Sequence, residues 1–533
     1  MKKKIKSILL VKLTSSNNHI NNYEIDNFPI PIHCNCKELI ADTVRQYMDD
    51  PNESTLSKID ALVYSAYGIT DSESVNDECT TKALLTKGKD TWGYKLYCDI
   101  QPILPSVTIE DCEAIINNNA SIKDICFQKE QKLSKFEERV AYQIECKYKK
   151  LSQQEVLNHT TFKLSELDLE MISAVPPGGS WKDIPIQTVE KSKRLTKINE
   201  TGGRTTLYGR IDYDKPSYTI TTYFNRPGNG TYVHPHFDRV ISVREAARFQ
   251  TFPDSYYFCG NKTEMLKQVG NAVPVLLAYS IGRAIKEKTG CHISVDLFSG
   301  AGGMTYGFEL AGIKASVATD IMESACTTLK TNNPQIPVVC GDITKDEIKQ
   351  EIIRRGKEAN ADIICGGPPC QGFSLAGLRM KDDPRNQLFR HFVDIVSGIK
   401  PKIIVFENVE GILSYEGGET YRNIIELFSE LGYYTEGRKL SANEYCVPQR
   451  RKRVIILCTR KDIGIKPESI YPEIITKEDK VQITARETIY DLEAIPCGEC
   501  AVYKEGYSSD LIKYFRGEIS ADDYYEMTKK RLR

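Results

Sequence analysis

Several features typical of secreted, membrane and uniformly basic proteins are missing from this 533-residue sequence. The apolar residues near Met1 soon give way to polar ones, unlike a signal peptide, and no apolar run approaches the length of a membrane span. Lys and Arg number 71 and Asp and Glu 72, so the formal net charge is −1. Any nucleic-acid surface must therefore be a local patch, and we expect a cytoplasmic protein without a membrane partner.

Paired metal-binding elements are missing as well. The seventeen cysteines are scattered through apolar segments of a long chain, which indicates reduced thiols and not a disulfide framework. Residues 497–500 form a single C-x-x-C and residues 33–36 a single His/Cys cluster. Because a zinc site usually combines two such elements, we expect no metal.

The length allows two to four domains, and the first of them carries no functional signal. Apolar residues at helical spacing predict helices over Glu38–Met48 and Leu56–Tyr67. Residues 129–150 form a charged amphipathic stretch, which is more often a solvated helix than a binding arm. We assign residues 1–157 to a helical N-terminal extension of unknown role.

A basic, loop-rich segment follows at residues 158–238. Its cationic side chains are Lys191, Lys193, Arg194, Lys197, Arg204 and Arg210. Residues 217–223 predict a strand, and residues 225–230 form a loop marked by Gly and Pro. Such a surface could bind DNA, although for an isolated basic segment a solvated face is the commoner explanation.

The pattern then changes to alternating strands and helices. Residues 293–298 predict a buried strand, residues 299–303 a glycine turn, and Thr305 the start of a helix. This is the opening βα unit of a nucleotide-type site, in which glycines let the backbone approach a ligand. Asp320, at the end of the next strand, is placed to bind ribose hydroxyls.

Later strands end in reactive side chains. Successive strand ends deposit Phe298, Asp320, Asp342, Cys370 and Glu407 along one edge of the predicted sheet. Singly, each acid is more often a helix cap, so the weight of the evidence is in the series. An extended segment from 449 to 453 then places Arg451 and Arg453 on the same side of the chain.

Cys370 follows two prolines that fix the backbone just before it. A thiol held in one direction indicates a nucleophile. The alternative is a buried structural cysteine, since free Cys is among the most buried residue types. The rigid Gly/Pro loop and the series of strand-end groups favour the nucleophile.

Four motifs carry a resemblance to the DNA cytosine-5 methyltransferase family of restriction–modification type. Residues 296–303 (DLFSGAGG) resemble its S-adenosylmethionine (AdoMet) motif, 368–371 (PPCQ) its nucleophile motif, 407–409 (ENV) its acid motif and 449–453 (QRRKR) its arginine motif. Residues 239–254 and 268–274 resemble segments that close the family's chain, yet here they precede the AdoMet motif. The order therefore looks circularly permuted, with the junction at Thr289-Gly290.

The resemblance implies an α/β fold: a Rossmann-like AdoMet-dependent methyltransferase sheet, a smaller loop-rich target-recognition domain and the helical N-terminal extension. In these terms, residues 158–238 are the target-recognition region and 239–290 the family's closing motifs. Residues 291–497 are the AdoMet-binding catalytic domain and 498–533 a C-terminal tail. The resemblance spans roughly residues 158–497.

It also implies site residues and a reaction. Cys370 adds to C6 of a flipped-out cytosine, Glu407 contacts N3 and the exocyclic amine, Arg451 holds the base oxygen and Arg453 supports the surrounding network. The family's AdoMet contacts correspond to Phe298, Gly300 and Gly302 at the methionine end, Asp320 at the ribose, Asp342 and Ile343 at the adenine, and Leu388 and Asn271 completing the pocket.

The implied partner is double-stranded DNA, bound by a monomer in the prokaryotic nucleoid. Whether a cognate restriction endonuclease acts beside it stays open. Two rivals are an RNA methyltransferase of the same fold and a catalytically idle DNA-binding module. The basic segment before Arg239 favours DNA over RNA, and the joint presence of Cys370, Glu407 and Arg451 argues against an idle module.

Overall fold

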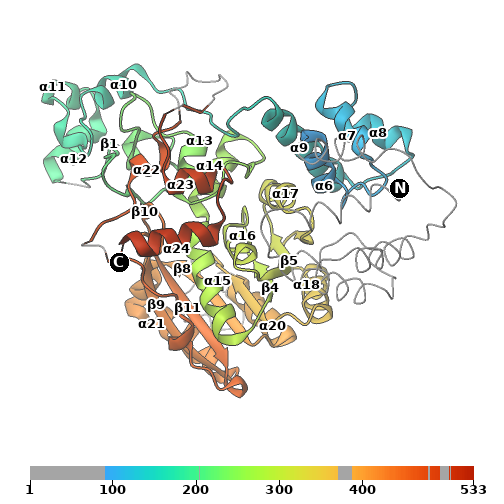
Figure 1. Ribbon diagram of the computed structural model, residues 1–533. Coiled ribbons are helices and arrows are strands. Elements are labelled where there is room, and N and C mark those ends of the chain that lie inside the picture. The colour runs from blue at the N-terminus through green and yellow to red at the C-terminus, as the bar shows by residue number, and fades with distance from the viewer. Residues whose placement is uncertain are drawn as a thin grey trace. The chain divides into compact units, whose positions relative to one another are not determined.

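The computed structural model describes residues 91–202, 205–369, 387–477, 480–492, 503–504 and 506–532 (Figure 1). The chain divides into two compact units, Met1–Cys98 with Thr108–Ala114, and Asp99–Val107 with Ile115–Arg533. The helices expected at 38–48 and 56–67 lie outside the described residues. Within those residues, no helix is both long and apolar enough to cross a bilayer.

A seven-stranded sheet forms the centre of the second unit, with strand order β6-β5-β4-β7-β8-β11-β9. The strands are β4 (Ile293–Leu297), β5 (Lys314–Asp320), β6 (Val338–Cys340), β7 (Ile363–Gly366), β8 (Ile403–Val409), β9 (Tyr433–Ser441) and β11 (Lys452–Arg460). β11 runs antiparallel to both β8 and β9, whereas β4 to β8 are parallel. The strand order reverses between β4 and β7, which is where open α/β sheets bind ligands.

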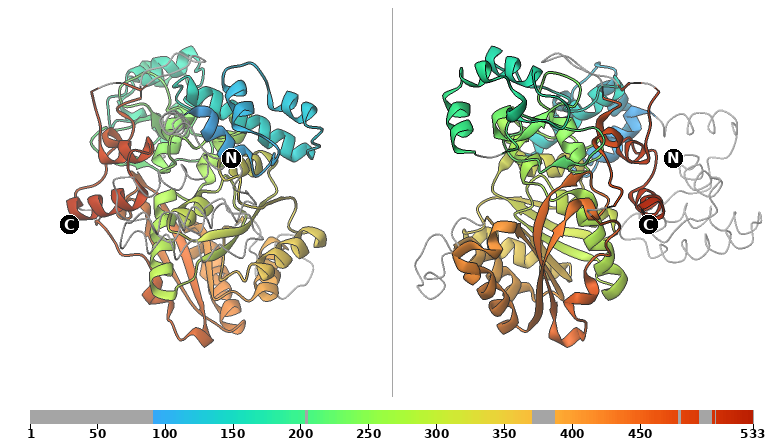
Figure 2. Two further views of the ribbon diagram at one scale, coloured as in Figure 1. Left: turned by 45° about the vertical axis from the view of Figure 1, so that its right-hand side comes forward. Right: turned by 90° about the vertical axis from the view of Figure 1, so that its left-hand side faces the viewer.

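Helices cover both faces of this sheet (Figure 2), because its central strands carry buried apolar residues that point to either side. On one face, Ile363 and Cys365 pack with α15 (Val275–Thr289) and α16 (Gly303–Leu310). On the other face, Ile364 packs with three helices: α18 (Asp346–Glu358), α20 (Gln387–Ile399) and α21 (Glu419–Glu430). The predicted Rossmann-like α/β architecture is thus confirmed.

α15 and α16 approach each other closely. A Cβ at Gly307 would lie 2.4 Å from the carbonyl oxygen of Val275, so only glycine allows this contact. The junction between α15 and β4 is short: Gly290 ends α15 in the left-handed conformation, with φ 71°, and β4 begins at Ile293. α15 therefore packs onto the first βα unit of the sheet.

The N-terminal extension is helical where it is described. Its helices are α6 (Trp92–Ile100), α7 (Ile109–Ile116), α8 (Ile122–Gln128) and α9 (Lys135–Ser152). Ser134 and Glu137 form a capping box that starts α9. Within the second unit, α9 lies against α17 (Glu323–Asn332), and Arg139 forms an ion pair with Glu323.

The basic segment folds as short elements around its own core, built from Met171, Trp181, Leu195, Leu207 and neighbours. The elements are α10 (Glu166–Ser173), α11 (Ile186–Val189), α12 (Lys193–Thr201), β1 (Gly209–Arg210), β2 (Ser217–Tyr218) and β3 (Thr231–Val233). The prediction of a strand over 217–223 is wrong beyond Tyr218. Only its first two residues pair, in parallel, with β10 (Gln449–Arg450).

The closing segments form a further core with α13 (Val243–Phe249), α14 (Lys262–Asn271) and α22 (Ala485–Ile489). Near the C-terminus, α23 (Asp510–Phe515) and α24 (Ala521–Leu532) pack on the face that carries α15. Short 3-10 turns complete the described chain at Trp181–Asp183, Pro227–Asn229, Glu410–Leu413, Tyr415–Gly418, Ala442–Glu444, Lys461–Ile463 and Pro467–Ile470.

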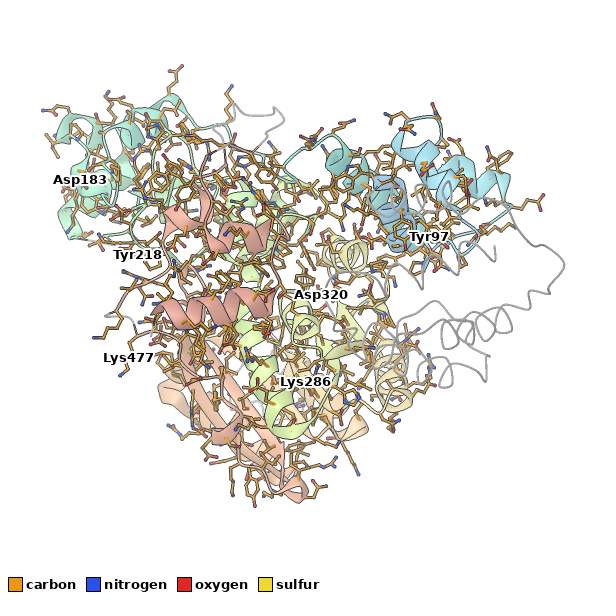
Figure 3. All side chains as sticks on the ribbon, in the orientation of Figure 1. Tyr97, Asp183, Tyr218, Lys286, Asp320 and Lys477 are labelled. Atoms are coloured by element: carbon orange, nitrogen blue, oxygen red, sulfur yellow. The ribbon has the colours of Figure 1, made fainter. Side chains whose placement is uncertain are left out.

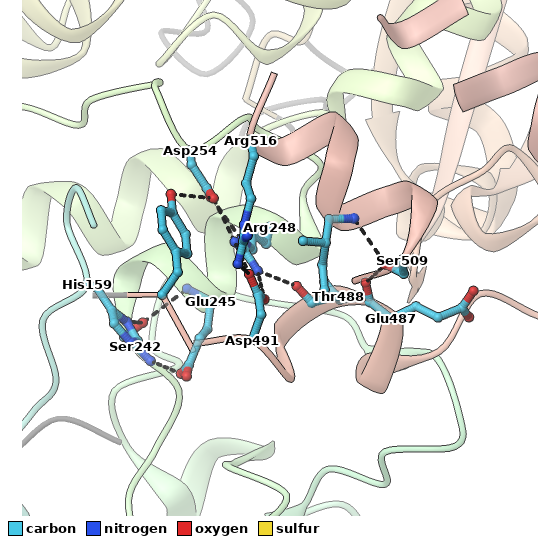
Figure 4. A network of polar contacts seen from close by, with 12 residues as sticks. His159, Ser242, Glu245, Arg248, Asp254, Glu487, Thr488, Asp491, Ser509 and Arg516 are labelled. Atoms are coloured by element: carbon cyan, nitrogen blue, oxygen red, sulfur yellow. Dashed lines mark hydrogen bonds and ion pairs between the residues drawn. The ribbon is translucent and has the colours of Figure 1, made fainter. Parts of the chain in front are cut away.

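Two arginines one turn apart on α13, Arg244 and Arg248, connect distant parts of the chain, and Figure 4 shows the contacts of Arg248. Arg248 donates to Asp254 and, at 2.5 Å, to Oδ1 of Asp491 just after α22. Arg244 donates to the carbonyl oxygen of Leu157 at 2.7 Å. Both guanidiniums are fully buried. The chain before residue 158 and the chain near residue 491 therefore meet on the same helix.

Candidate active site

A cavity of about 630 Å³ opens at the carboxyl ends of the parallel strands. The turn after β4 and the ends of β5, β6, β7 and β8 all line it, together with the end of α14. Asp320, at the end of β5, is labelled in Figure 3. The cavity walls include nine predicted site residues: Asn271, Phe298, Gly300, Asp320, Asp342, Ile343, Leu388, Glu407 and Arg453. The structure thus gathers in one place residues separated by up to 182 positions in the chain, as expected from the series of strand ends.

The turn after β4 is held in a shape that needs glycine. Gly300 and Gly302 have φ values of 52° and 85°, and Gly302 is the N-cap of α16. The backbone N–H of Gly300 donates to Oδ2 of Asp320 at 2.8 Å, which ties the turn to the end of β5. Gly302 itself does not line the cavity, so its role is to shape the turn.

Two acids at neighbouring strand ends differ in their electrostatics. Asp320 accepts backbone N–H groups from Gly300 and Met322, but burial raises the pKa of its carboxyl. The backbone N–H and hydroxyl of Thr344 lower the pKa of Asp342. Asp320 can therefore accept hydrogen bonds from a ligand's hydroxyl groups in an enclosed position.

Glu407 and Arg453 form an ion pair on the opposite wall, with Oε1 and Nε 2.8 Å apart. The loop after β7 lies directly against this pair, since a Cβ at Gly367 would meet Oε2 of Glu407 at 2.5 Å. Nδ2 of Asn408 donates to the carbonyl oxygen of Pro368 at 3.1 Å. The strand that carries the acid and the proline loop that leads to Cys370 are thus interlocked. Cys370 itself lies outside the described residues.

The structure places Arg451 elsewhere. Its guanidinium is fully buried and donates to the carbonyl oxygens of Ile220 and Gly270, both at 2.8 Å. Burial lowers the pKa of this group. Arg451 is not among the residues of the cavity wall, so the expected contact with a base oxygen does not fit this geometry. Alternation along the predicted extended segment placed Arg451 on the same side as Arg453, but it could not show that other segments cover Arg451.

Several wall residues were missed in the sequence. Asp296, inside the strand predicted at 293–298, is not among the expected site residues but lines the cavity. Ile321 is 69% exposed in the cavity wall, although an aliphatic residue of that size is usually buried. Its position directly after Asp320 was the available signal. Such a residue can pack against a planar ring.

The basic segment does not offer all of its cations to a partner. Arg210 is buried and donates to the carbonyl oxygens of Val175 and Ile172. Lys191 pairs with Glu170 at 2.5 Å. Lys193, Arg194 and Lys197 are exposed on α12, whereas Arg204 lies outside the described residues. The patch available to a polyanion is therefore smaller than the sequence indicated.

The sequence matches the family of C-5 cytosine-specific DNA methylases over residues 107–287 and 293–518. The chain belongs to this family. Residues of the family's motifs meet at the cavity, and in the described part of the chain no group of three or more potential ligands could hold a metal ion. The boundary between the two matched ranges falls at the short junction between α15 and β4.

Curated relatives are type II methyltransferases. The chain is 40% identical over 244 residues to M.XorII of Xanthomonas oryzae pv. oryzae, covering 45% of this chain and 54% of that one. It is 38% identical over 225 residues to M.BspRI of Lysinibacillus sphaericus, covering 38% and 53%. The chain thus spans about half the length of these relatives. Among solved structures, a mutant of Spodoptera frugiperda DNMT2 is 28% identical over 32% of this chain and 50% of that one, with a TM-score of 0.27.

The cavity fits AdoMet, the methyl donor of this methylase family. The glycine turn leaves room beside the sheet, because no atom lies within 4 Å of the position that a Cβ would occupy at Gly300. Asp320 offers carboxylate oxygens to a ribose, and Ile321 offers an apolar surface to a purine ring. Asn271, at the end of α14, adds a side-chain amide to the cavity wall.

Proposed function

We propose that this protein is a DNA (cytosine-5-)-methyltransferase that methylates C5 of a flipped-out cytosine in a specific double-stranded sequence, in a restriction–modification system. The observation that carries the proposal is the Glu407–Arg453 pair, which faces the cofactor cavity beside the proline loop leading to Cys370. A carboxylate and a guanidinium there can bind the polar edge of one pyrimidine.

In the proposed mechanism, the thiolate of Cys370 forms a bond to C6 of the cytosine. Glu407 contacts N3 and the exocyclic amine, so that negative charge does not build up on the ring during this attack. The ring then becomes an enamine that is nucleophilic at C5. AdoMet, when bound, supplies the electrophilic methyl group. Loss of the C5 proton and departure of the Cys370 sulfur restore the aromatic base.

We assign the contact with the base oxygen to Arg453, because its side chain lies in the cavity wall and pairs with Glu407. Arg451 is a positioning residue. By holding Ile220 and Gly270 it fixes the strand end that carries Arg453 and the end of α14 that carries Asn271. A stacked base cannot reach such an enclosed site, so base flipping belongs to the proposal.

We also propose the domain limits and the permuted order described above. Support comes from α13, which binds both residue 157 and residue 491. In a chain with the family's usual order, these two regions would be continuous. The proposal further assigns recognition of the DNA sequence to residues 158–238. It takes the protein to be a monomer that acts on the nucleoid in the cytoplasm. A cognate restriction endonuclease would act on the same DNA sequence independently of this chain.

The test is transfer of a labelled methyl group from AdoMet to double-stranded DNA, with tRNA as the rival substrate. We expect methylated DNA, unlabelled tRNA, and no transfer by Cys370→Ala. DNA that contains 5-fluorocytosine should form a denaturant-resistant adduct with the wild type, because no C5 proton can leave. Bisulfite sequencing then gives the target sequence. Labelled tRNA with unlabelled DNA would overturn the proposal in favour of the RNA enzyme.

A further inference from the structure

The cavity carries more acid than base. Its ionisable acids are Asp296, Asp320, Asp342 and Glu407, and its bases are Lys267 and Arg453. Glu407 and Arg453 compensate each other in their ion pair. Three carboxyl groups therefore remain against one lysine, so the described cavity wall favours a ligand that carries positive charge.

Asp296 is the most deeply buried of these acids, with an exposed fraction of 1%. It lies on β4, opposite Cys365 of β7. The hydroxyl of Thr305, on α16, donates to its Oδ2 at 2.5 Å. Within the described residues, Asp296 has no ion-pair partner, and the ionisable groups that act on it are the Cys365 thiol, the Asp320 carboxyl and the Tyr256 phenol. None of these is a cation.

This environment makes the ionised form of Asp296 costly. Burial, the largest cause, and the nearby Asp320 together raise the pKa of the Asp296 carboxyl to about 7. A positive charge that enters the cavity acts in the opposite direction and favours the carboxylate. The charge of Asp296 is therefore coupled to the charge of whatever occupies the cavity.

We propose that Asp296 is the residue by which the cavity distinguishes AdoMet from its demethylated product, S-adenosylhomocysteine. The inference rests on the proposed function and concerns the same site. The two ligands share adenine, ribose and amino-acid groups and differ in the sulfonium, which carries a positive charge in AdoMet only. Asp296 is ionised when the sulfonium is present. After methyl transfer the sulfur is a neutral thioether, Asp296 takes a proton from solvent, and the preference for the ligand falls.

The test is equilibrium binding of AdoMet and S-adenosylhomocysteine to the full-length protein between pH 6 and pH 8. We expect the Kd of AdoMet to fall as pH rises, by up to ~10-fold per pH unit below the pKa of Asp296, because AdoMet prefers the carboxylate. The Kd of S-adenosylhomocysteine should change less than about twofold over the same range. Calorimetry in buffers of different ionisation enthalpy should show proton release with AdoMet only.

Asp296→Asn should abolish the pH dependence for AdoMet and bring the two affinities closer, with binding of S-adenosylhomocysteine retained. Asp342→Asn is the matched control: this cavity carboxyl is expected at the adenine, which both ligands share, so both should weaken alike. If Asp296→Asn does not fold, Thr305→Val serves instead. It removes the hydrogen bond that stabilises the carboxylate, so the AdoMet profile should move to higher pH.

Parallel pH profiles for the two ligands, or equal weakening of both by Asp296→Asn, would overturn the inference while leaving the proposed function intact. A wild-type protein that binds neither nucleoside would overturn both. Methyl transfer to DNA, measured separately, tells these two failures apart.

Discussion

Oε1 of Glu407 lies 2.8 Å from Nε of Arg453, and the two side chains are 12% and 13% exposed. The pair joins β8 to the antiparallel β11, whose backbone register holds the two residues in place. An ion pair this enclosed fixes the direction of both charged groups, and one side of each faces the cavity.

We expect Glu407→Gln to reduce methyl transfer by ~10²–10⁴-fold, because a side-chain amide cannot donate a proton to N3 of the base as a carboxyl group can. AdoMet affinity should stay within about threefold of wild type, since Asp320 and the glycine turn lie on other strands. Single-turnover methylation and nucleoside binding give the two readouts. Glu410→Gln is the control: Glu410 belongs to an exposed ion pair with Lys439 just beyond the same strand, and its loss should change neither readout.

Arg453→Lys tests geometry at constant charge. A lysine ammonium cannot reproduce the fork of a guanidinium that binds Glu407 and a base oxygen together. We expect the variant to fold normally and to lose methyl transfer by ~10-fold or more, while keeping AdoMet binding. Full activity would show that Arg453 does not contact the base.

Arg451 should behave differently from Arg453. Its replacement by Met leaves the carbonyl oxygens of Ile220 and Gly270 buried without a donor. We expect the free energy of unfolding to fall by ~3 kcal/mol, measured in urea. If the variant is as stable as wild type and loses only methyl transfer, the substrate contact first expected for Arg451 is right.

These two arginines show what could be inferred from the sequence and what could not. The order of strands and the meeting of their ends depend on local patterns, so the sheet and most of the cavity wall were predictable. The start of a helix also depends on a local pattern. Ser242, for example, caps α13 together with Glu245 three residues later. Arg451 is buried by Ile220, 231 residues away, and by Gly270, 181 residues away. No local pattern contains such contacts, and the same holds for the burial of Arg210.

Acid sensitivity should depend on His234. Its ring is fully buried, Nδ1 accepts the N–H groups of His236 and Phe237, and burial lowers its pKa from 6.5 to about 3. The unfolded chain therefore binds more protons than the folded one between pH 6.5 and pH 3. This contribution to stability is complete above that window and is lost as pH falls through it, by at most ~1.4 kcal/mol per unit.

We expect His234→Asn to flatten this part of the stability profile, measured as the urea midpoint from pH 7 to pH 4. His236→Asn is the control, because that ring is exposed two residues away. An unchanged slope in His234→Asn would assign acid sensitivity to other groups. The carboxyl of Glu245, whose pKa Arg239 keeps low, would then be the next candidate.

The junction between α15 and β4 should tolerate a break. A protease site inserted at Gly290 should not clash with neighbouring residues, because no atom lies within 4 Å of the position where a Cβ would be. After cleavage we expect the two fragments to co-elute from a sizing column and to retain AdoMet binding, since α15 packs closely on α16. Adding Gly307→Val, which places a side chain against Val275, should separate them. Dissociation without that change would show that the closing motifs need the covalent link.

Only part of residues 158–238 is expected to select the DNA sequence. Residues 217–224 are built into the catalytic frame: β2 pairs with β10, Arg451 binds Ile220, and a Cβ at Gly270 would meet the backbone of Thr221 at 2.5 Å. Residues 164–208, in contrast, pack mainly around their own core. We therefore expect an exchange of 164–208 with a relative of different target to move the methylated sequence, whereas an exchange that includes 217–224 should unfold the protein.

Within the same region, Lys193→Gln on α12 should weaken binding to all DNA sequences alike and lower the salt slope by about one, because an exposed lysine there neutralises a phosphate. Lys191→Gln should have a smaller effect, since Glu170 already compensates that charge. A side chain that contacts a base edge would instead cost ~1–3 kcal/mol at one base position only. An active exchange variant that still methylates the original site would place recognition outside 164–208, with the N-terminal extension as the next segment to exchange.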